Sequence, residues 1–223
     1  MTVPQKLTAV QVQEAGLDDW RQILNRLKAR FRTGDMRSGT ALASRIGELA
    51  AAVQGHPEIV VTPGDVVVAL STPEVRGITP RDLDLARQIS EAAAGLGISA
   101  DVAGLTQLEL GLDTVATDRL APFYAALLGS QIQRGEPVDP SGQVPTVWWQ
   151  DPGEEDPELA LPATTFEQRW HFDVWVPHDE AANRLRAVLG AGGRLVSDAG
   201  APSYWVVEDP DGNRSCICTP SGR

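Results

Sequence analysis

The sequence predicts an α+β protein, because helix-type and strand-type patterns alternate along it in two different arrangements. Over residues 1–100 the order is α-β-α-β-β-α, which favours helices packed on one face of a small antiparallel sheet. Over residues 101–223 a βαβββ pattern occurs twice in tandem, which favours two units joined in one cupped sheet. Each range is long enough to form a domain, so we expect a domain boundary near residue 100.

The first predicted domain contains three helical patterns. A short one covers residues 8–15, and a longer one, rich in Ala, Leu and Ile at helical spacing, covers residues 36–53. Asp35 precedes the longer helix and is a suitable N-cap. The third pattern starts with Thr79 as N-cap and Pro80 at the first helical position, and it ends at one of the glycines that follow residue 94.

Strand patterns lie between these helices. Residues 22–33 alternate roughly between apolar and polar side chains and could form a strand or a helix. Residues 58–62 and 66–71 are two runs of β-branched side chains separated by Pro-Gly-Asp. Such a pair of runs around a turn sequence predicts a β-hairpin.

The second predicted domain is built from an internal repeat. Residues 108–129 (LELGLDTVATDRLAPFYAALLG) and 171–190 (HFDVWVPHDEAANRLRAVLG) each read as a strand, an acidic turn and a helix that ends in Leu-Gly. Strand-like segments follow each copy: SQIQRG, PTVWWQ and ELAL after the first, and GRLVSD, SYWVVED and RSCICT after the second.

Charge and composition exclude several classes of protein. The formal net charge of −11 argues against binding to nucleic acid, which requires clustered Lys and Arg. No apolar run approaches the roughly 20 residues that span a bilayer, and the N-terminus lacks a signal-peptide pattern. The two cysteines, Cys216 and Cys218, are too close along one predicted strand to bridge each other. We therefore expect a cytoplasmic protein with no membrane partner.

Two stretches of the first half carry a family resemblance: ALASRIGELAAAVQGHPEI, and VVVALSTPEVRGITPRDLDLARQI with its Gly-Ile-Thr-Pro-Arg-Asp element. Through them, residues 5–97 resemble the pterin-4a-carbinolamine dehydratase family. That family removes water from a 4a-hydroxytetrahydropterin. The resemblance implies proton transfer by histidines, because an imidazole gains and loses a proton near neutral pH.

The family's site pattern is only partly present. The resemblance assigns the second histidine of a His-His-Pro element to His56 and a downstream aspartate to Asp82, which are the expected catalytic residues. Pro57 and Glu58 follow His56 and are expected to contact a ligand. The other family positions hold residues that cannot transfer a proton: Gly55 and Pro73 replace histidines, and Pro63 replaces an aromatic residue. The alternative for His56 is a hydrogen-bonded structural histidine.

Residues 105–220 resemble the vicinal-oxygen-chelate superfamily, which includes glyoxalases and bleomycin-resistance proteins, through FYAALLG, WHFDVWVP and EDPDGNRSCI. The superfamily's metal positions fall on Gln107, His171 and Cys216. An amide, an imidazole and a thiol are a poor donor set for a hard cation, and zinc would need a further donor such as Glu109 or Asp173. We expect no bound metal and no cofactor.

Strand alternation indicates which side chains accompany His171. If His171 faces the cup, then Asp173 and Trp175 do so too, while Phe172, Val174 and Val176 face the helices. If Cys216 faces the cup, Arg214 does so as well. These five side chains (His171, Asp173, Trp175, Arg214 and Cys216) are the expected ligand-binding residues of this half, and they suit a flat organic ligand with polar edges. The alternative for the tryptophan is ordinary core packing.

Three functions are consistent with these observations. The first is a dehydratase-like protein with depleted catalytic histidines that binds a small aromatic or pterin-like ligand. The second is a non-catalytic protein that binds or sequesters a small molecule, of the bleomycin-resistance type. The third is an interaction protein, because dehydratase-family members associate through their helices. The resemblance implies a homo-oligomer.

Overall fold

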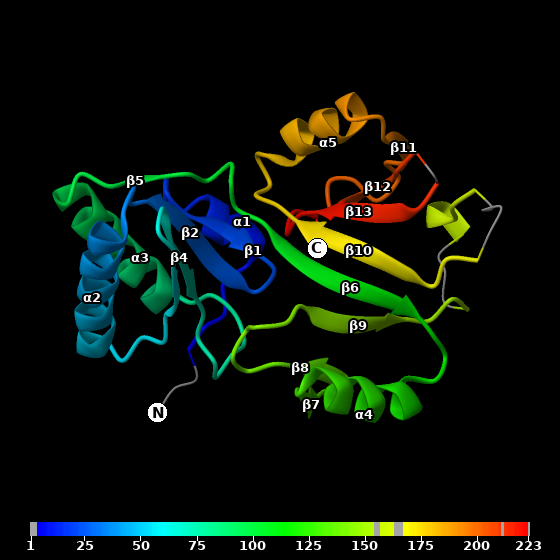
Figure 1. The fold of residues 1–223 in the computed structure, drawn as a ribbon, viewed down its shortest axis with the longest axis horizontal. Coiled ribbons are helices and arrows are strands. Elements are labelled where there is room, and N and C mark those ends of the chain that lie inside the picture. The colour runs from blue at the N-terminus through cyan, green and yellow to red at the C-terminus, as the bar shows by residue number, and fades with distance from the viewer. Residues whose placement is uncertain (1–3, 154–156, 163–166, 211, 223) are drawn as a thin grey trace. The chain divides into compact units, whose positions relative to one another are not determined.

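The computed structural model describes residues 4–153, 157–162, 167–210 and 212–222. They form two compact units (Figure 1). The first unit contains the chain up to Leu105 together with Pro177–Asp179, and the second contains Thr106–Val176 and Glu180–Gly222. The fold class is α+β, as predicted, with an antiparallel sheet in the first unit and a mixed sheet in the second.

The first unit is a five-stranded antiparallel sheet with helices on one face. The strand order is β1-β2-β4-β3, and a short β5 also pairs with β2. The elements are α1 (Ala9–Gln13), β1 (Arg21–Ile23), β2 (Arg26–Arg32), α2 (Met36–Ala52), β3 (Glu58–Val61), β4 (Asp65–Leu70), α3 (Pro80–Gly95) and β5 (Ser99–Ala100).

Alternation along β2 sends every second side chain into the core. Phe31 is fully buried there and packs in one cluster with Ile46 of α2 and with Leu85 and Ile89 of α3. Burial of this apolar surface, at roughly 25 cal/mol per Å², holds α2 and α3 against the sheet. One face of the sheet is therefore the helix-covered face.

Helix starts in this unit follow the predicted caps. The Asp35 carboxylate accepts a hydrogen bond of 2.8 Å from the backbone N–H of Ser38 at the start of α2. Thr79 and Asp82 form a reciprocal capping box at the start of α3, with Pro80 at its first position. Residues 22–33, for which the sequence was consistent with a strand or a helix, belong to the hairpin of β1 and β2. Leu24, in the turn of this hairpin, has a positive φ of 53°.

The second unit contains a six-stranded mixed sheet in the order β11-β12-β13-β10-β6-β9. Its elements are β6 (Gln107–Asp113), α4 (Thr117–Leu128), β7 (Gln131–Gln133), β8 (Glu136–Val138), β9 (Thr146–Gln150), β10 (Trp170–Trp175), α5 (Ala181–Gly190), β11 (Arg194–Ser197), β12 (Tyr204–Glu208) and β13 (Arg214–Cys218). No helix among the described residues is long and apolar enough to cross a membrane.

The predicted duplication is visible in the strand pairing. Each copy pairs its first strand in parallel with its last, β6 with β9 and β10 with β13. The two first strands, β6 and β10, pair antiparallel with each other. Glu109 lies opposite Asp173 at the centre of that register, so the two copies are related by an approximate two-fold axis at this pair. Figure 1 shows α4 and α5 at opposite ends of the sheet.

One predicted strand was wrong. The ELAL segment contains a 3-10 turn, Pro157–Leu159, and the missing strand of the first copy is β8. β7 lies within the predicted SQIQRG segment, whereas β8 has only three residues, which is too short for an alternation pattern to be recognised in the sequence. Arg134 and Gly135, with φ of 55° and 81°, form the tight turn that joins β7 to β8.

Candidate functional site

The residues predicted as the dehydratase site lie at the start of β3 and of α3. His56 is exposed, and in the described part of the chain its ring has no hydrogen bond or ion pair. Pro57 is half-buried, and Glu58 forms an ion pair with Arg26 of β2. Burial and the neighbouring Arg26 lower the pKa of Lys28 to about 8, a shift that Glu58 opposes.

Asp82 is buried, and its carboxylate accepts hydrogen bonds from neighbouring threonines. Its Oδ2 accepts hydrogen bonds from the Thr72 hydroxyl (2.7 Å), the Thr79 backbone N–H (2.8 Å) and the Thr79 hydroxyl (2.9 Å). Thr72 and Thr79 are themselves almost completely buried. Through these hydrogen bonds Asp82 links the start of α3 to the segment that follows β4. A catalytic role of Asp82 stays a prediction.

The positions where the family has other site residues are part of turns. Pro63 is in the turn between β3 and β4, and Pro73 is in a turn closed by a hydrogen bond from the Thr72 backbone N–H to the Gly77 carbonyl (2.8 Å). Gly55 donates its backbone N–H to the Ala50 carbonyl at the end of α2 (2.8 Å). His56 is thus the one imidazole among these positions.

In the second unit, alternation along β10 places His171, Asp173 and Trp175 on one side of the sheet. Val174 and Val176 point to the other side and pack in the core beneath α5. In the register, Asp173 is beside Glu109 of β6 and Cys216 of β13. We call the side that carries His171 the His171 face, and the opposite side, which carries α4 and α5, the helix face.

His171 lies between two carboxylates. Its Nδ1 is 3.9 Å from Asp113 Oδ1, and its Nε2 is 3.8 Å from Asp173 Oδ1. Trp148 meets the imidazole at right angles, with ring centroids 5.6 Å apart, and its buried indole N–H has no hydrogen-bond partner among the described residues. Gly111 makes room for the imidazole, because a Cβ at this position would lie 2.4 Å from the ring.

The other predicted ligand-binding residues of this half are held by different contacts. Trp175 is 3% exposed, and its Nε1 donates a hydrogen bond of 2.9 Å to Glu109 Oε2. The Arg214 guanidinium donates to the Pro162 carbonyl at 2.6 Å. Cys216 is half-buried next to Asp173. The structure thus brings His171, Asp173 and Cys216 together, whereas Trp175 is mainly a core residue.

The superfamily's metal positions do not fit a metal here. Gln107 pairs with Trp175 in the register, four residues away from Gly111, which is the partner of His171. Across the described ranges, no three His, Cys, Asp or Glu side chains converge as a metal site would require. An amide, an imidazole and a thiol also lack the charge that a hard divalent cation prefers. We derive no chemistry that passes through a metal.

Two parts of this site were missed in the sequence. Asp113 is on the same face as Glu109 because it follows four residues later on β6, but only the strand register brings it to His171. Gly111 could not be recognised as a site residue in the sequence because it has no side chain. The His171 imidazole occupies the space that a Cβ at position 111 would fill. With Trp148, these residues form an acidic, aromatic surface that can accept hydrogen bonds from a flat, nitrogen-rich ligand.

Comparison with known proteins agrees with this two-part architecture. Residues 5–92 match the family model for pterin 4 alpha carbinolamine dehydratase, and residues 109–218 match the model for a glyoxalase-like domain. A protein of Thermosynechococcus vestitus named "Putative pterin-4-alpha-carbinolamine dehydratase" is 34% identical over 84 residues, which are 38% of this chain and 88% of the relative. A protein of the same name from Nocardia farcinica is 35% identical over 77 residues, 34% of this chain and 81% of the relative.

A solved structure also aligns with part of the chain. The crystal structure of a transcriptional coactivator/pterin dehydratase from Brucella melitensis covers 40% of this chain and 99% of its own, with 25% identity and a TM-score of 0.39. Fold and matches together define a two-domain protein, with a dehydratase-type domain followed by a glyoxalase-like domain. The chain belongs to the pterin-4a-carbinolamine dehydratase family.

Proposed function

We propose that this protein binds a flat, nitrogen-rich heterocycle of the pterin class, and that its dehydratase activity is much weaker than that of a site with three histidines. The observation that carries the proposal is that the predicted dehydratase site of the first unit has only one imidazole. His56 is exposed and unpartnered in the described residues, while Gly55 and Pro73 occupy the other histidine positions.

The chemistry explains why this loss matters. Dehydration of a 4a-hydroxytetrahydropterin removes the N5 proton, protonates the C4a hydroxyl as it leaves as water, and forms the N5=C4a double bond. Two proton transfers are needed, and each positioned acid or base contributes roughly 10²- to 10⁴-fold. His56 can serve only one of them at a time, and the Asp82 Oδ2 atom already accepts three hydrogen bonds.

The His171 face supports the binding part of the proposal. The pterin ring presents an amino group beside a ring N–H, and such an edge donates two parallel hydrogen bonds to a carboxylate. Asp113 and Asp173 flank His171 at 3.9 and 3.8 Å, and Trp148 adds an aromatic ring beside the imidazole. We therefore assign a non-catalytic pterin-binding surface to this face, and residual proton transfer to a separate substrate molecule bound beside His56 in the first unit.

Two measurements test the proposal. Conversion of a 4a-hydroxytetrahydropterin to the quinonoid dihydropterin is followed by absorbance, with wild type, His56→Ala and, as a control, His178→Ala. We expect a slow rate above buffer that His56→Ala abolishes and His178→Ala keeps. A rate equal to buffer for the wild type contradicts residual catalysis, and a rate matching that of a three-histidine homologue contradicts its depletion.

Binding is measured separately by calorimetry with 7,8-dihydrobiopterin. We expect His171→Ala and Asp173→Asn to weaken binding tenfold or more, and His56→Ala to change it less than threefold. Absence of binding by the wild type, or an equal loss in all three variants, contradicts the assignment to the His171 face. Self-association and a cytoplasmic location stay predictions, and light scattering of the purified chain tests the first.

A further inference from the structure

The helix face of the second unit carries a groove that is separate from the His171 face. Three neighbouring strands contribute one row of side chains to its floor: Phe172 of β10, Ser215 of β13 and Val207 of β12. Val188 near the end of α5 and Pro210 after β12 form its walls, and Trp170 lies at the edge. The groove has a volume of about 670 Å³, which lies within the range of sites for small organic molecules.

The groove exists because α5 covers only part of the helix face. α5 packs over Val176, Val207 and Ile217, which lie beside the later part of β10. At the start of β10, Trp170 packs edge-on against Tyr124 of α4, with ring centroids 5.5 Å apart, and the groove lies between these two contacts. As a result Phe172 is 52% exposed and Trp170 is 38% exposed, although both are on a strand at the middle of the sheet. Adjacent exposed aromatic side chains that border a cavity are a frequent mark of a binding surface.

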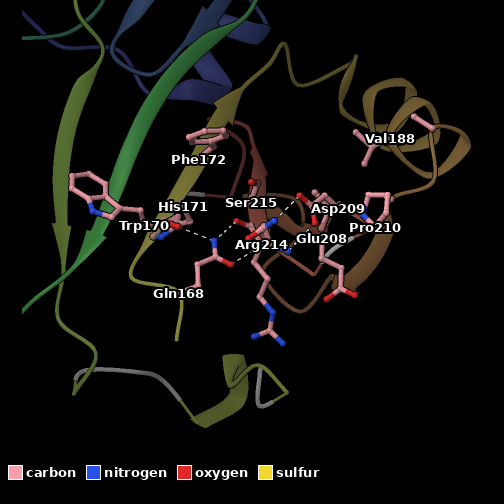
Figure 2. A pocket seen from close by; sticks show the side chains of 14 residues that line it. Gln168, Trp170, His171, Phe172, Val188, Glu208, Asp209, Pro210, Arg214 and Ser215 are labelled. Carbon is pink, nitrogen blue, oxygen red and sulfur yellow. Dashed lines mark hydrogen bonds between the residues drawn. The ribbon is translucent and has the colours of Figure 1, made fainter. Parts of the chain in front are cut away.

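The groove and the His171 face do not share a binding surface. His171 borders the groove through its place on β10, but its ring packs against Gly111 and Trp148 on the other side of the sheet. Figure 2 shows the Phe172 ring and Val188 on either side of the groove, while the Arg214 side chain extends away from both.

The lining residues define the kind of ligand. Glu208 pairs with Arg194 at 2.5 Å, and Asp209 accepts hydrogen bonds of 2.8 and 2.9 Å from Asn213. The Arg214 guanidinium donates to the Pro162 carbonyl, and its buried Nε has no hydrogen-bond partner among the described residues. Figure 2 shows the Arg214 side chain extending away from Phe172. The Gln168 amide bonds the backbone N–H and carbonyl of Arg214 at 2.7 and 2.8 Å. The Ser215 hydroxyl, in contrast, has no partner in the described residues.

We propose that this groove binds an uncharged, flat aromatic molecule, which stacks on Phe172 and Trp170 and exchanges one hydrogen bond with Ser215. An aromatic side chain on the floor, Phe172, and one at the edge, Trp170, favour a planar ring system. A charged ligand stacked on Phe172 would lose its hydration there, because Glu208 is paired with Arg194 and the Arg214 side chain extends away from Phe172. This ligand therefore differs from the hydrogen-bond-rich heterocycle assigned to the His171 face.

Two fluorescent probes with the same ring skeleton test the proposal on the full chain. N-phenyl-1-naphthylamine is uncharged, and 1-anilinonaphthalene-8-sulfonate carries a sulfonate. We expect saturable binding of the uncharged probe with a Kd at least tenfold below that of the sulfonate. Equal affinity, tighter binding of the sulfonate, or no saturable signal would overturn the proposal.

Variants then locate the bound probe. Phe172→Ala and Trp170→Ala should each raise the Kd of the uncharged probe tenfold or more, and Ser215→Phe, which fills the floor, should abolish binding. Phe123→Ala is the matched control, because Phe123 is 58% exposed on α4 and does not line the groove. His171→Ala should also leave the Kd within twofold. An equal effect of Phe172→Ala and Phe123→Ala, or loss of binding with His171→Ala alone, contradicts the location.

Discussion

Leu85 occupies the space into which a side chain at Gly55 would extend. A Cβ on Gly55 would lie 2.7 Å from Leu85 Cδ2, closer than non-bonded carbon atoms approach each other. Leu85 is 2% exposed and belongs to the core between α3 and the sheet. The absence of an imidazole at position 55 is therefore coupled to the size of residue 85.

This coupling predicts the outcome of restoring the histidine. Gly55→His alone should destabilise the fold by about 1–3 kcal/mol, because it overpacks a filled site. In a Leu85→Val background the same change should cost less, by at least about 0.5 kcal/mol in a double-mutant cycle. Urea denaturation of the four proteins measures the coupling, and an equal cost of Gly55→His in both backgrounds would show that Leu85 is not the obstacle.

Adding the other lost histidine should raise dehydratase activity. Pro73 is exposed in its turn, so Pro73→His is expected to fold. Combined with Gly55→His and Leu85→Val it should raise the dehydration rate by roughly 10²-fold or more, since a second proton-transfer group becomes available. Glu74→His on the same turn is the control. If Glu74→His raises the rate as much as Pro73→His does, the gain in rate does not depend on placing the imidazole at the position where the family has its histidine.

Asp82→Ala separates a structural role from a catalytic one. The change leaves the Thr79 backbone N–H and two buried hydroxyls without their acceptor, so the free energy of unfolding should fall by about 1–3 kcal/mol. Asp84→Ala, which removes an exposed carboxylate two residues later on α3, should change it by less than about 0.5 kcal/mol. Similar losses in both variants, measured by urea denaturation, would contradict the capping role.

Gly111→Ala should displace the His171 ring, because the added Cβ would lie 2.4 Å from it. We expect a loss of stability of about 1–3 kcal/mol and shifted resonances of the His171 ring in NMR spectra. Gly47→Ala is the control: Gly47 is exposed within α2 with nothing close to its Cβ direction. That change should stabilise the protein by about 0.5–1 kcal/mol. An unshifted His171 signal in Gly111→Ala would contradict the contact.

Asp101 should contribute to the dependence of stability on pH. The Arg32 guanidinium donates hydrogen bonds of 2.6 and 3.1 Å to Asp101 and, above all other causes, lowers the pKa of its carboxyl. A pKa that is lower in the folded than in the unfolded chain gives stability that is complete above the unfolded value of about 3.9. This stability is lost as the pH falls through the folded value.

Asp101→Asn should therefore lower the free energy of unfolding at pH 7 and make it fall less steeply below about pH 4. Asp18→Asn, a change at an exposed position, should leave the profile close to that of the wild type. Urea denaturation between pH 2.5 and 7 compares the three proteins. Parallel profiles for wild type and Asp101→Asn would exclude this contribution.

The elements that could be predicted are those whose cause is local. Asp35, Thr79 and Pro80 define helix starts through caps that act within one turn, and the helices begin where these residues indicate. β7 lies within the predicted SQIQRG strand, whereas β8 was missed because three residues cannot display a period, and because the turn at Arg134 and Gly135 takes its shape from backbone angles.

The sequence predicted which site residues share a face of one strand, but not which residues of a neighbouring strand lie beside them. Alternation placed His171, Asp173 and Trp175 on one face from the sequence alone. The contact of His171 with Asp113 depends on the register between β6 and β10, which are separated by more than fifty residues. Asp82 has the residue type expected of an acid and of a helix cap alike, and its buried threonine partners decide in favour of the cap as its structural role.

The duplication has a consequence for how a ligand can be oriented. Glu109 and Asp173 meet at the approximate axis, so a symmetric pair of sites would offer any molecule two equivalent ways to bind. The positions two residues before them, Gln107 and His171, hold different side chains and remove that equivalence. A ligand bound at His171 therefore has one preferred orientation, because the equivalent position in the other copy of the repeat carries a different side chain.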